Sequence, residues 1–185
     1  MSKFFEKFIP GSATPLEQMR ARVLTATCFA IGGAIVAMLL YWIVFSWLEQ
    51  WETVVIGLVI VLFLAGMLAL VKRGKIRPVA WTLTIVLLLL NVANLTGYGV
   101  GTVSSAGLLI PIVLAAFTLG PWTGIGTAIL SSVAVFGIAL AGSTGALQTE
   151  IPFHESNLSF DAMTLTLIYL MIGMICAVAA PKGEK

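Results

Sequence analysis

Ionisable side chains are scarce in this sequence. Of its 185 residues only 10% are charged and only one is a histidine, whereas 59% are hydrophobic. This composition leaves too few polar groups to cover the surface of a water-soluble domain of this size. It therefore excludes a soluble globular protein and predicts a membrane protein.

The long apolar runs carry no acidic or basic residue away from their ends. Between their ends there is no Asp, Glu, Lys, Arg or His. Proton relays, ion pumps and voltage sensors need ionisable groups inside the membrane, and haem or metal ligation there would need a buried His. We therefore disfavour ion-coupled transport and a metal centre within the bilayer.

Catalytic motifs are absent as well. The sequence holds no Ser/His/Asp arrangement in plausible proximity, no glycine-rich loop joined to a strand and no paired carboxylates in a shielded pocket. His154 and the acidic residues near it lack a metal-ligand spacing, although His154 could sense external pH. We predict a protein that is not an enzyme, with no catalytic residue and no metal site.

Cysteine is nearly absent. The two cysteines, Cys28 and Cys176, both lie in apolar runs. A cysteine in such a place usually packs as a small apolar side chain. We infer no disulfide.

Six apolar stretches can cross a bilayer as helices. A transmembrane helix needs about 20 apolar residues, and the runs lack the alternation of a barrel strand. They cover residues 21–47, 53–71, 78–96, 104–119, 122–141 and 161–180. The sequence predicts an all-α, polytopic membrane protein with six transmembrane helices, made of a cytoplasmic amphipathic segment (1–20), one transmembrane domain (21–180) and a cytoplasmic tail (181–185).

The positive charges predict the orientation of these helices. Lys and Arg are retained on the cytoplasmic side during insertion. All ten fall on one side of a six-helix topology: Lys3, Lys7, Arg20, Arg22, Lys72, Arg73, Lys75, Arg77, Lys182 and Lys185. We predict a multi-pass protein of the bacterial inner membrane with both termini in the cytoplasm. The charges suit contact with anionic lipids and form no cluster dense enough for nucleic acid.

A capping signal precedes the first apolar stretch. Ser12 or Thr14, with Pro15 and Glu17 following, has the pattern that begins a helix. We expect a helix that starts there and runs on into the membrane.

A few polar side chains enter the predicted spans near their external ends. Asn91 and Asn94 are one helical turn apart, and Ser104 and Ser105 begin the next span. They could form hydrogen bonds between helices, or they could form the floor of a ligand pocket that opens to the outside. Pro111 is expected to kink the fourth span because it leaves a carbonyl unpaired.

Small residues recur at a spacing of four on two predicted helices. Such stripes let two helix backbones approach closely in a membrane, within one chain or between chains. The candidate helix-packing positions are Gly120, Gly124, Ala128 and Ser132 on one helix and Ala26, Ala30 and Ala34 on the other.

The order of these features resembles a known membrane region. Arg20 and Arg22, the basic turn 72–77, a Gly-rich external turn and the segments 108–111 and 119–124 resemble the six-helix membrane sensor region of bacterial histidine kinases. The resemblance extends from Arg20 to about residue 179. In those proteins a catalytic output domain follows the sixth helix, whereas this sequence ends at Lys185. We therefore expect binding or assembly rather than kinase chemistry.

A second resemblance is to the substrate-binding S component of energy-coupling-factor vitamin transporters. It rests on the six spans and on the Leu-Gly-Pro-Trp-Thr-Gly turn at 119–124. In that family a helix with an Ala-x-x-x-Ala pattern contacts the coupling subunit, and the matching positions here are Ala26, Ala30 and Ala34. The ligand would then lie beneath the external loops near Asn91 and Asn94.

Three functions follow as hypotheses. The first is a sensor-type membrane domain that lacks an output domain. The second is an accessory subunit of a larger energy-transducing membrane complex, and the third is a vitamin-binding transport subunit. The first two share one expectation, which is association with other membrane protein subunits and with lipids. A lipophilic small ligand also stays open, and the sequence names no cofactor.

Overall fold

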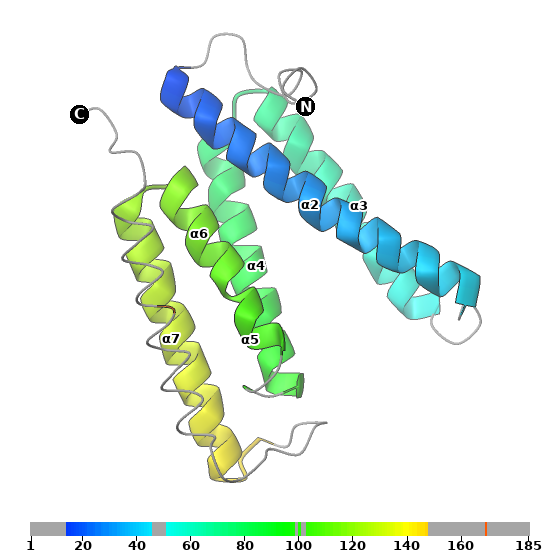
Figure 1. Ribbon diagram of the computed structural model, residues 1–185, viewed down its shortest axis with the longest axis vertical. Coiled ribbons are helices and arrows are strands. Elements are labelled where there is room, and N and C mark those ends of the chain that lie inside the picture. Colours follow the sequence, from blue (N-terminus) through cyan, green and yellow to red (C-terminus); the bar gives the residue numbers. More distant parts are fainter. Residues whose placement is uncertain (1–13, 46–50, 99, 101–102, 148–168, 170–185) are drawn as a thin grey trace. The chain divides into compact units, whose positions relative to one another are not determined.

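The computed structural model describes residues 14–45, 51–98, 100, 103–147 and 169 (Figure 1). This part of the chain is helical and contains no strand, so the all-α prediction is confirmed. Its helices are α2 (Pro15–Phe45), α3 (Trp51–Lys72), α4 (Ile76–Tyr98), α5 (Val103–Gly107), α6 (Leu109–Thr118) and α7 (Pro121–Ser143).

Four segments are long and apolar enough to cross a membrane. They are Pro15–Ala37, Val54–Lys72, Ile76–Gly97 and Pro121–Ser143, and a shorter apolar segment covers Ser105–Thr118. Large apolar side chains on them point outward, as Leu62 on α3 and Val133 on α7 do with 71% and 64% of their surface exposed. Such faces suit lipid rather than water. The length and composition of these helices therefore indicate a membrane protein.

The six predicted spans are described only in part. The fourth, 104–119, corresponds to α5 and α6, which meet at Leu108 with right-handed helical backbone angles and together form the apolar helix Ser105–Thr118. The sixth, 161–180, lies outside the described residues except for the helical Tyr169. The cytoplasmic position of both termini stays a prediction.

The chain divides into two compact units, Met1–Val79 and Ala80–Lys185.

In the first unit, Thr14 and Glu17 form a reciprocal cap at the start of α2. The Glu17 carboxylate accepts from the Thr14 backbone N–H at 3.0 Å, and the Glu17 N–H donates to the Thr14 hydroxyl at 3.3 Å. Two of the donors that a helix start leaves without partners are satisfied in this way. The cap predicted at this place is confirmed and belongs to Thr14.

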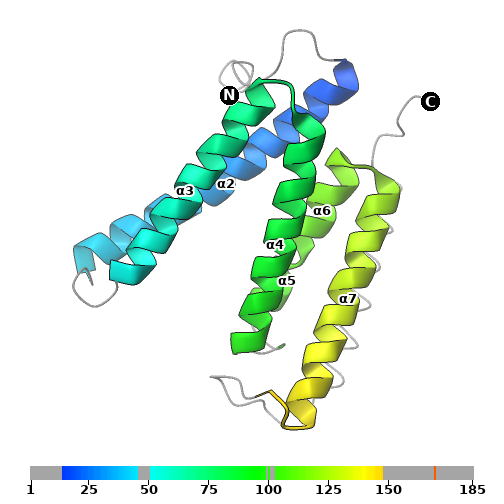
Figure 2. The same ribbon diagram turned by 180° about the vertical axis from the view of Figure 1, so that it is seen from behind.

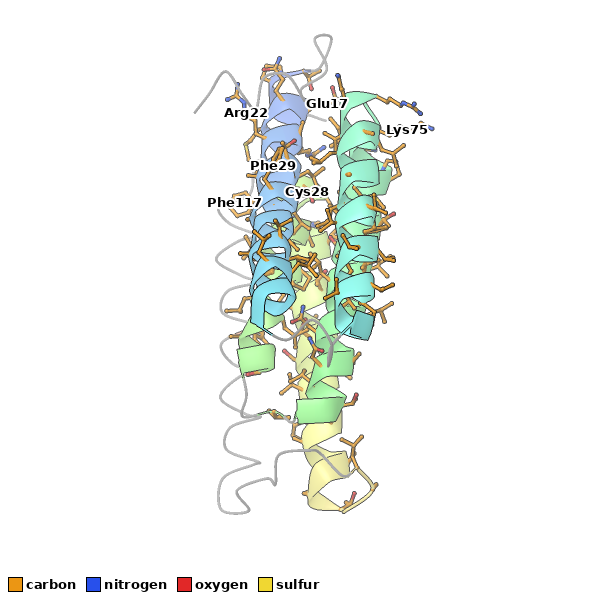
Figure 3. The ribbon with its side chains drawn as sticks, turned by 90° about the vertical axis from the view of Figure 1, so that its right-hand side faces the viewer. Glu17, Arg22, Cys28, Phe29, Lys75 and Phe117 are labelled. Atoms are coloured by element: carbon orange, nitrogen blue, oxygen red, sulfur yellow. The ribbon has the colours of Figure 1, made fainter. Side chains whose placement is uncertain are left out.

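Helices α2 and α3 pack as an antiparallel pair (Figure 1). A methyl group added at Gly57 would lie 2.5 Å from Leu39 Cδ2, and one added at Gly32 would lie 3.7 Å from Leu64 Cδ1. The same register brings the start of α2 level with the end of α3. Figure 3 shows Glu17, Arg22 and Lys75 at this common end. The basic residues of both segments therefore lie together, as the positive-inside prediction needs.

A glycine makes the turn from α3 into α4. Gly74 has φ +80°, and two backbone bonds close the end of α3, from Gly74 N–H to Val71 O at 2.9 Å and from Lys75 N–H to Leu70 O at 3.0 Å. This is the Schellman arrangement, in which a left-handed residue pairs the last carbonyls of a helix.

Gly74→Ala is expected to destabilise the protein by about 1 kcal/mol, because only the left-handed backbone opposes the new methyl group. Nothing lies within 4 Å of that methyl position. Gly66→Ala is the matched control, since Gly66 is helical and equally open. Unfolding by SDS in mixed micelles, followed by circular dichroism, measures both variants. An equal stability for the two would contradict the strain at Gly74.

The second unit has an apolar core between α4, α6 and α7. Its buried members are Leu95, Val100, Leu108, Ile112, Ala128, Val135, Ile138, Ala139 and Tyr169. Figure 2 shows α5 and α6 following one another beside α7. In water, the burial of apolar surface stabilises a protein by about 25 cal/mol per Å². Lipid is itself apolar, so helices in a membrane associate through close packing instead.

Candidate functional site

The polar residues predicted near the external helix ends come from α4 and α5. Asn91 is half-buried, Ser105 is buried and Asn94 is exposed. Nothing is described of the side chain of Ser104. The structure therefore draws Asn91 and Ser105 into the interior of the second unit and leaves Asn94 at its surface.

The centre of this site is the interruption between α5 and α6. Leu108 joins the two helices with right-handed helical angles, φ −65° and ψ −16°, and its N–H donates to the Ser105 carbonyl at 3.3 Å, so that the interruption is one of the hydrogen-bond pattern. Pro111 occupies the first turn of α6 and has no N–H, so the carbonyl of Gly107 has no helical donor four residues on. Pro111 thus removes one helical hydrogen bond, and the kink expected there stays a prediction. Leu108 itself is fully buried.

Asn91 packs directly against the end of α5. Its amide nitrogen donates to the Leu87 carbonyl of α4 at 2.8 Å, which fixes the side chain. Its amide oxygen occupies the place that a Cβ of Gly107 would need. The absence of a side chain at Gly107 therefore allows α4 and α5 to meet here.

Tyr169 reaches the same interruption from the last apolar segment. Its hydroxyl donates to the Ser105 carbonyl, and the residue is fully buried. The ring belongs to the core that contains Leu108 and Ile112. Tyr169 therefore belongs to the apolar core with its ring and bonds to α5 with its hydroxyl.

A further polar group lies level with the interruption. Gly124 of α7 lies against Ala116 of α6. Ser131 follows Gly124 by seven residues and Leu109 precedes Ala116 by seven, so the antiparallel register places Ser131 beside the start of α6. Seven residues make almost two full turns, so Ser131 is on the same face as Gly124. Its hydroxyl is buried without a hydrogen-bond partner among the described residues.

The small-residue stripe of α7 faces the interior. A methyl group added at Gly124 would lie 2.6 Å from Ala116 Cβ and 2.9 Å from Ala116 Cα. Ala128 and Ser132 are also buried, and the Ser132 hydroxyl donates to the Ala128 carbonyl at 2.9 Å. Gly124 therefore lies in the contact between α6 and α7, and Ala128 and Ser132 continue its buried face within one chain.

Gly120 differs from the other three members of that stripe. It precedes α7 as the N-cap residue, with φ +120°, and nothing lies within 4 Å of its missing Cβ. Its role is to turn the chain into Pro121, the first residue of α7, because a left-handed φ is accessible to glycine.

The small-residue stripe of α2 is exposed, whereas that of α7 is buried. Ala26, Ala30 and Ala34 are all exposed, and so are Gly33 and Ala37. Leu24, Cys28 and Leu39, which are buried, lie on the other side of the helix at 100° per residue. The face of α2 away from α3 therefore consists of small residues over three turns.

No known protein provides a further guide to this site. Comparison of the chain with known protein families, with curated proteins and with solved structures finds no match.

Two residues of this site were not predicted from the sequence. Tyr169 and Ser131 are single polar residues in long apolar helices, and nothing in their spacing sets them apart. Gly107 and Pro111 carried a signal, since together they suggest a bend. His154 and the acidic residues near it lie outside the described residues, and the described part of the chain has no group of three potential metal ligands.

Proposed function

We propose that this protein is a non-enzymatic subunit of the bacterial inner membrane that works by associating with other membrane proteins through the outer face of α2. We propose as well that its termini are cytoplasmic, in keeping with the basic residues at the common end of α2 and α3. The accessory-subunit and sensor hypotheses share this mode of action.

The small-residue face of α2 is the observation that carries the proposal. Large apolar side chains such as Leu58, Val59 and Leu62 are exposed on α3 as far as its middle. On the outer face of α2 the exposed residues include the small Ala26, Ala30 and Gly33. Small residues gain little from lipid, but they let a second helix approach closely, which is the main source of association between helices in a membrane.

The α7 stripe supports the assignment by contrast. It has the same small-residue pattern, and its partner is α6 of the same chain. Of these two predicted stripes, the one on α2 is left uncovered by the described residues. In the part of the chain that the structure describes, the α2 stripe therefore offers a partner's helix a matching surface.

Enlarging the α2 face is expected to abolish the association. Ala30→Leu and Ala34→Leu place large side chains where the partner backbone must approach, and we expect recovery of the partner to fall at least about tenfold, which corresponds to about 1.4 kcal/mol. The test is purification from native membranes in mild detergent, with quantification of every co-purified protein. Val59→Leu is the control, since Val59 is 60% exposed on α3.

Two outcomes separate the hypotheses. A partner in a fixed ratio that is lost from the two alanine variants and kept in the control supports an accessory subunit, and a substoichiometric partner with the same pattern supports a sensor. Recovery of the same proteins from all variants would contradict the role of α2.

A vitamin-binding transport subunit is the second candidate. The exposed Ala26, Ala30 and Ala34 are the positions that the resemblance to S components assigns to the coupling subunit. Coupling ATPases among the proteins lost from the Ala30→Leu variant would favour this function over the first.

A further inference from the structure

Basic residues gather at the end of the first unit where α2 begins and α3 ends. They are Arg20 and Arg22 in α2, Lys72 in α3, Arg73 and Lys75 in the turn, and Arg77 in α4. Figure 3 shows Arg22 and Lys75 at this end of the two helices. Glu17 is the one acidic residue that the structure describes there, so six cations face one carboxylate.

Glu17 shows that two of these cations, from different helices, lie close to one another. Its carboxylate is attracted both by Arg20 of its own helix and by Arg77 of α4. One oxygen of that carboxylate also accepts from the Thr14 backbone N–H at 3.0 Å and from the Thr14 hydroxyl at 3.1 Å. Because it belongs to the cap of α2 and carries a single charge, Glu17 leaves most of the positive charge around it unbalanced.

Arg20 is the basic residue that needs a further acceptor. Its side chain is half-buried, and its Nε is buried without a hydrogen-bond partner in the described part of the chain. A guanidinium is always charged, and a buried charged donor without an acceptor is costly. Arg22 lies two residues on, about 200° around the helix, and is exposed. The two arginines therefore differ in surroundings although they carry the same charge.

The span ends place these cations at the depth of lipid headgroups. The apolar segment of α3 ends at Lys72, and that of α4 begins at Ile76. Trp81 lies four residues after Arg77 on the same side of α4 and is 49% exposed. Tryptophan prefers the boundary between headgroups and acyl chains, which puts Arg77 one turn further out, among the phosphates. Phosphate oxygens are strong acceptors for a guanidinium.

We propose that Arg20 and Arg77, together with the basic turn between α3 and α4, bind the phosphate of one anionic phospholipid. The Arg20 guanidinium donates to the phosphate oxygens. Arg77 and the turn supply the positive charge that favours an anionic headgroup over a zwitterionic one. The site is independent of the partner that α2 binds, because the small-residue face of α2 contributes none of its residues.

Binding of phosphatidylglycerol to the purified protein tests the site. Native mass spectrometry in mild detergent separates the protein with no lipid from the protein with one, and a titration gives the dissociation constant of the first lipid. We expect Arg20→Gln to weaken this binding at least about tenfold, because a charge-assisted donor is lost.

Arg22→Gln is the matched control. It removes the same charge two residues away, from an exposed side chain, and should change the dissociation constant less than about twofold. Equal losses in the two variants would overturn the site, because net charge alone would then govern lipid binding.

Arg77→Gln tests the site from the second helix and does not depend on the folding of Arg20→Gln. Arg77 is exposed, so its replacement leaves the packing of the unit unchanged. We expect a loss of about fivefold in the affinity for phosphatidylglycerol, the effect of one cation near the membrane surface. An unchanged affinity would overturn the proposal.

Two further probes identify the source of the phosphate. Phosphatidylcholine with the same acyl chains should bind at least about tenfold more weakly than phosphatidylglycerol, and equal binding would overturn the selection for an anionic headgroup. Inorganic phosphate at the concentration of the lipid should leave phosphatidylglycerol bound, because it lacks acyl chains to place on the apolar helix faces. Displacement of the lipid by inorganic phosphate would overturn the lipid as the occupant.

Discussion

Replacing Gly124 by alanine is expected to lower the free energy of unfolding by about 1–3 kcal/mol, because the new methyl group overlaps the neighbouring helix. It would lie 2.6 Å from Ala116 Cβ and 2.9 Å from Ala116 Cα. The second atom belongs to the backbone, so no side-chain rotation can relieve the overlap and α6 must move away from α7. SDS titration in mixed micelles, followed by circular dichroism, measures the loss.

Gly126→Ala provides the matched control. Gly126 lies in the same helix two residues on, and nothing is found within 4 Å of its missing Cβ. Alanine has the higher helix propensity, so we expect this variant to be unchanged or up to about 1 kcal/mol more stable. Equal effects of the two substitutions would contradict the close approach of α6 to Gly124.

Gly107→Ala is expected to cost about 1–3 kcal/mol as well, for a different reason. Its methyl group would take the place of the Asn91 amide oxygen. The Asn91 side chain would then have to leave the position in which its nitrogen donates to Leu87 O at 2.8 Å. The same unfolding titration measures this variant.

A double-mutant cycle identifies the partner. Asn91→Ala removes the obstacle, so the second substitution should recover most of the stability lost in Gly107→Ala, with a coupling of about 0.5–3 kcal/mol. Asn94→Ala replaces Asn91→Ala in the control cycle, since Asn94 is exposed and one turn away. Additive effects of the Asn91 and Gly107 substitutions would show that the two residues do not meet.

The helices themselves could be predicted from the sequence because lipid imposes a simple rule. A backbone in hydrocarbon must pair its own polar groups, so each long apolar run becomes a helix. The predicted stretch 78–96 corresponds to α4, and 122–141 corresponds to α7. The Thr14 cap followed from side-chain chemistry between residues three apart, which a sequence shows directly.

Interior and exterior faces could not be predicted in the same way. In a soluble protein the polar face of a helix marks the outside, but in a membrane both faces are apolar. The stripes at Gly124 and at Ala30 have the same spacing, yet one is buried and the other is exposed. Gly120 fits the spacing as well, although it lies in the turn before α7. The partner of a stripe depends on tertiary packing.

The polar site shows the same limit. Asn91 and Ser105 were recognised as polar residues in apolar helices, and both lie in the interior of the second unit. Their actual partners, Gly107 and Tyr169, come from different segments of the chain. A pairing of residues 64 positions apart, as between Ser105 and Tyr169, leaves no periodic signal in a sequence.

The outer face of α2 is the surface on which the proposed association depends. A photoreactive amino acid at position 30, on that face, reports directly what touches it in native membranes. A second sample carries the same group at Leu62, which is 71% exposed on α3. We predict a single defined protein adduct from position 30 and only lipid adducts from position 62. Lipid adducts alone from both positions would contradict the proposal that α2 binds a partner.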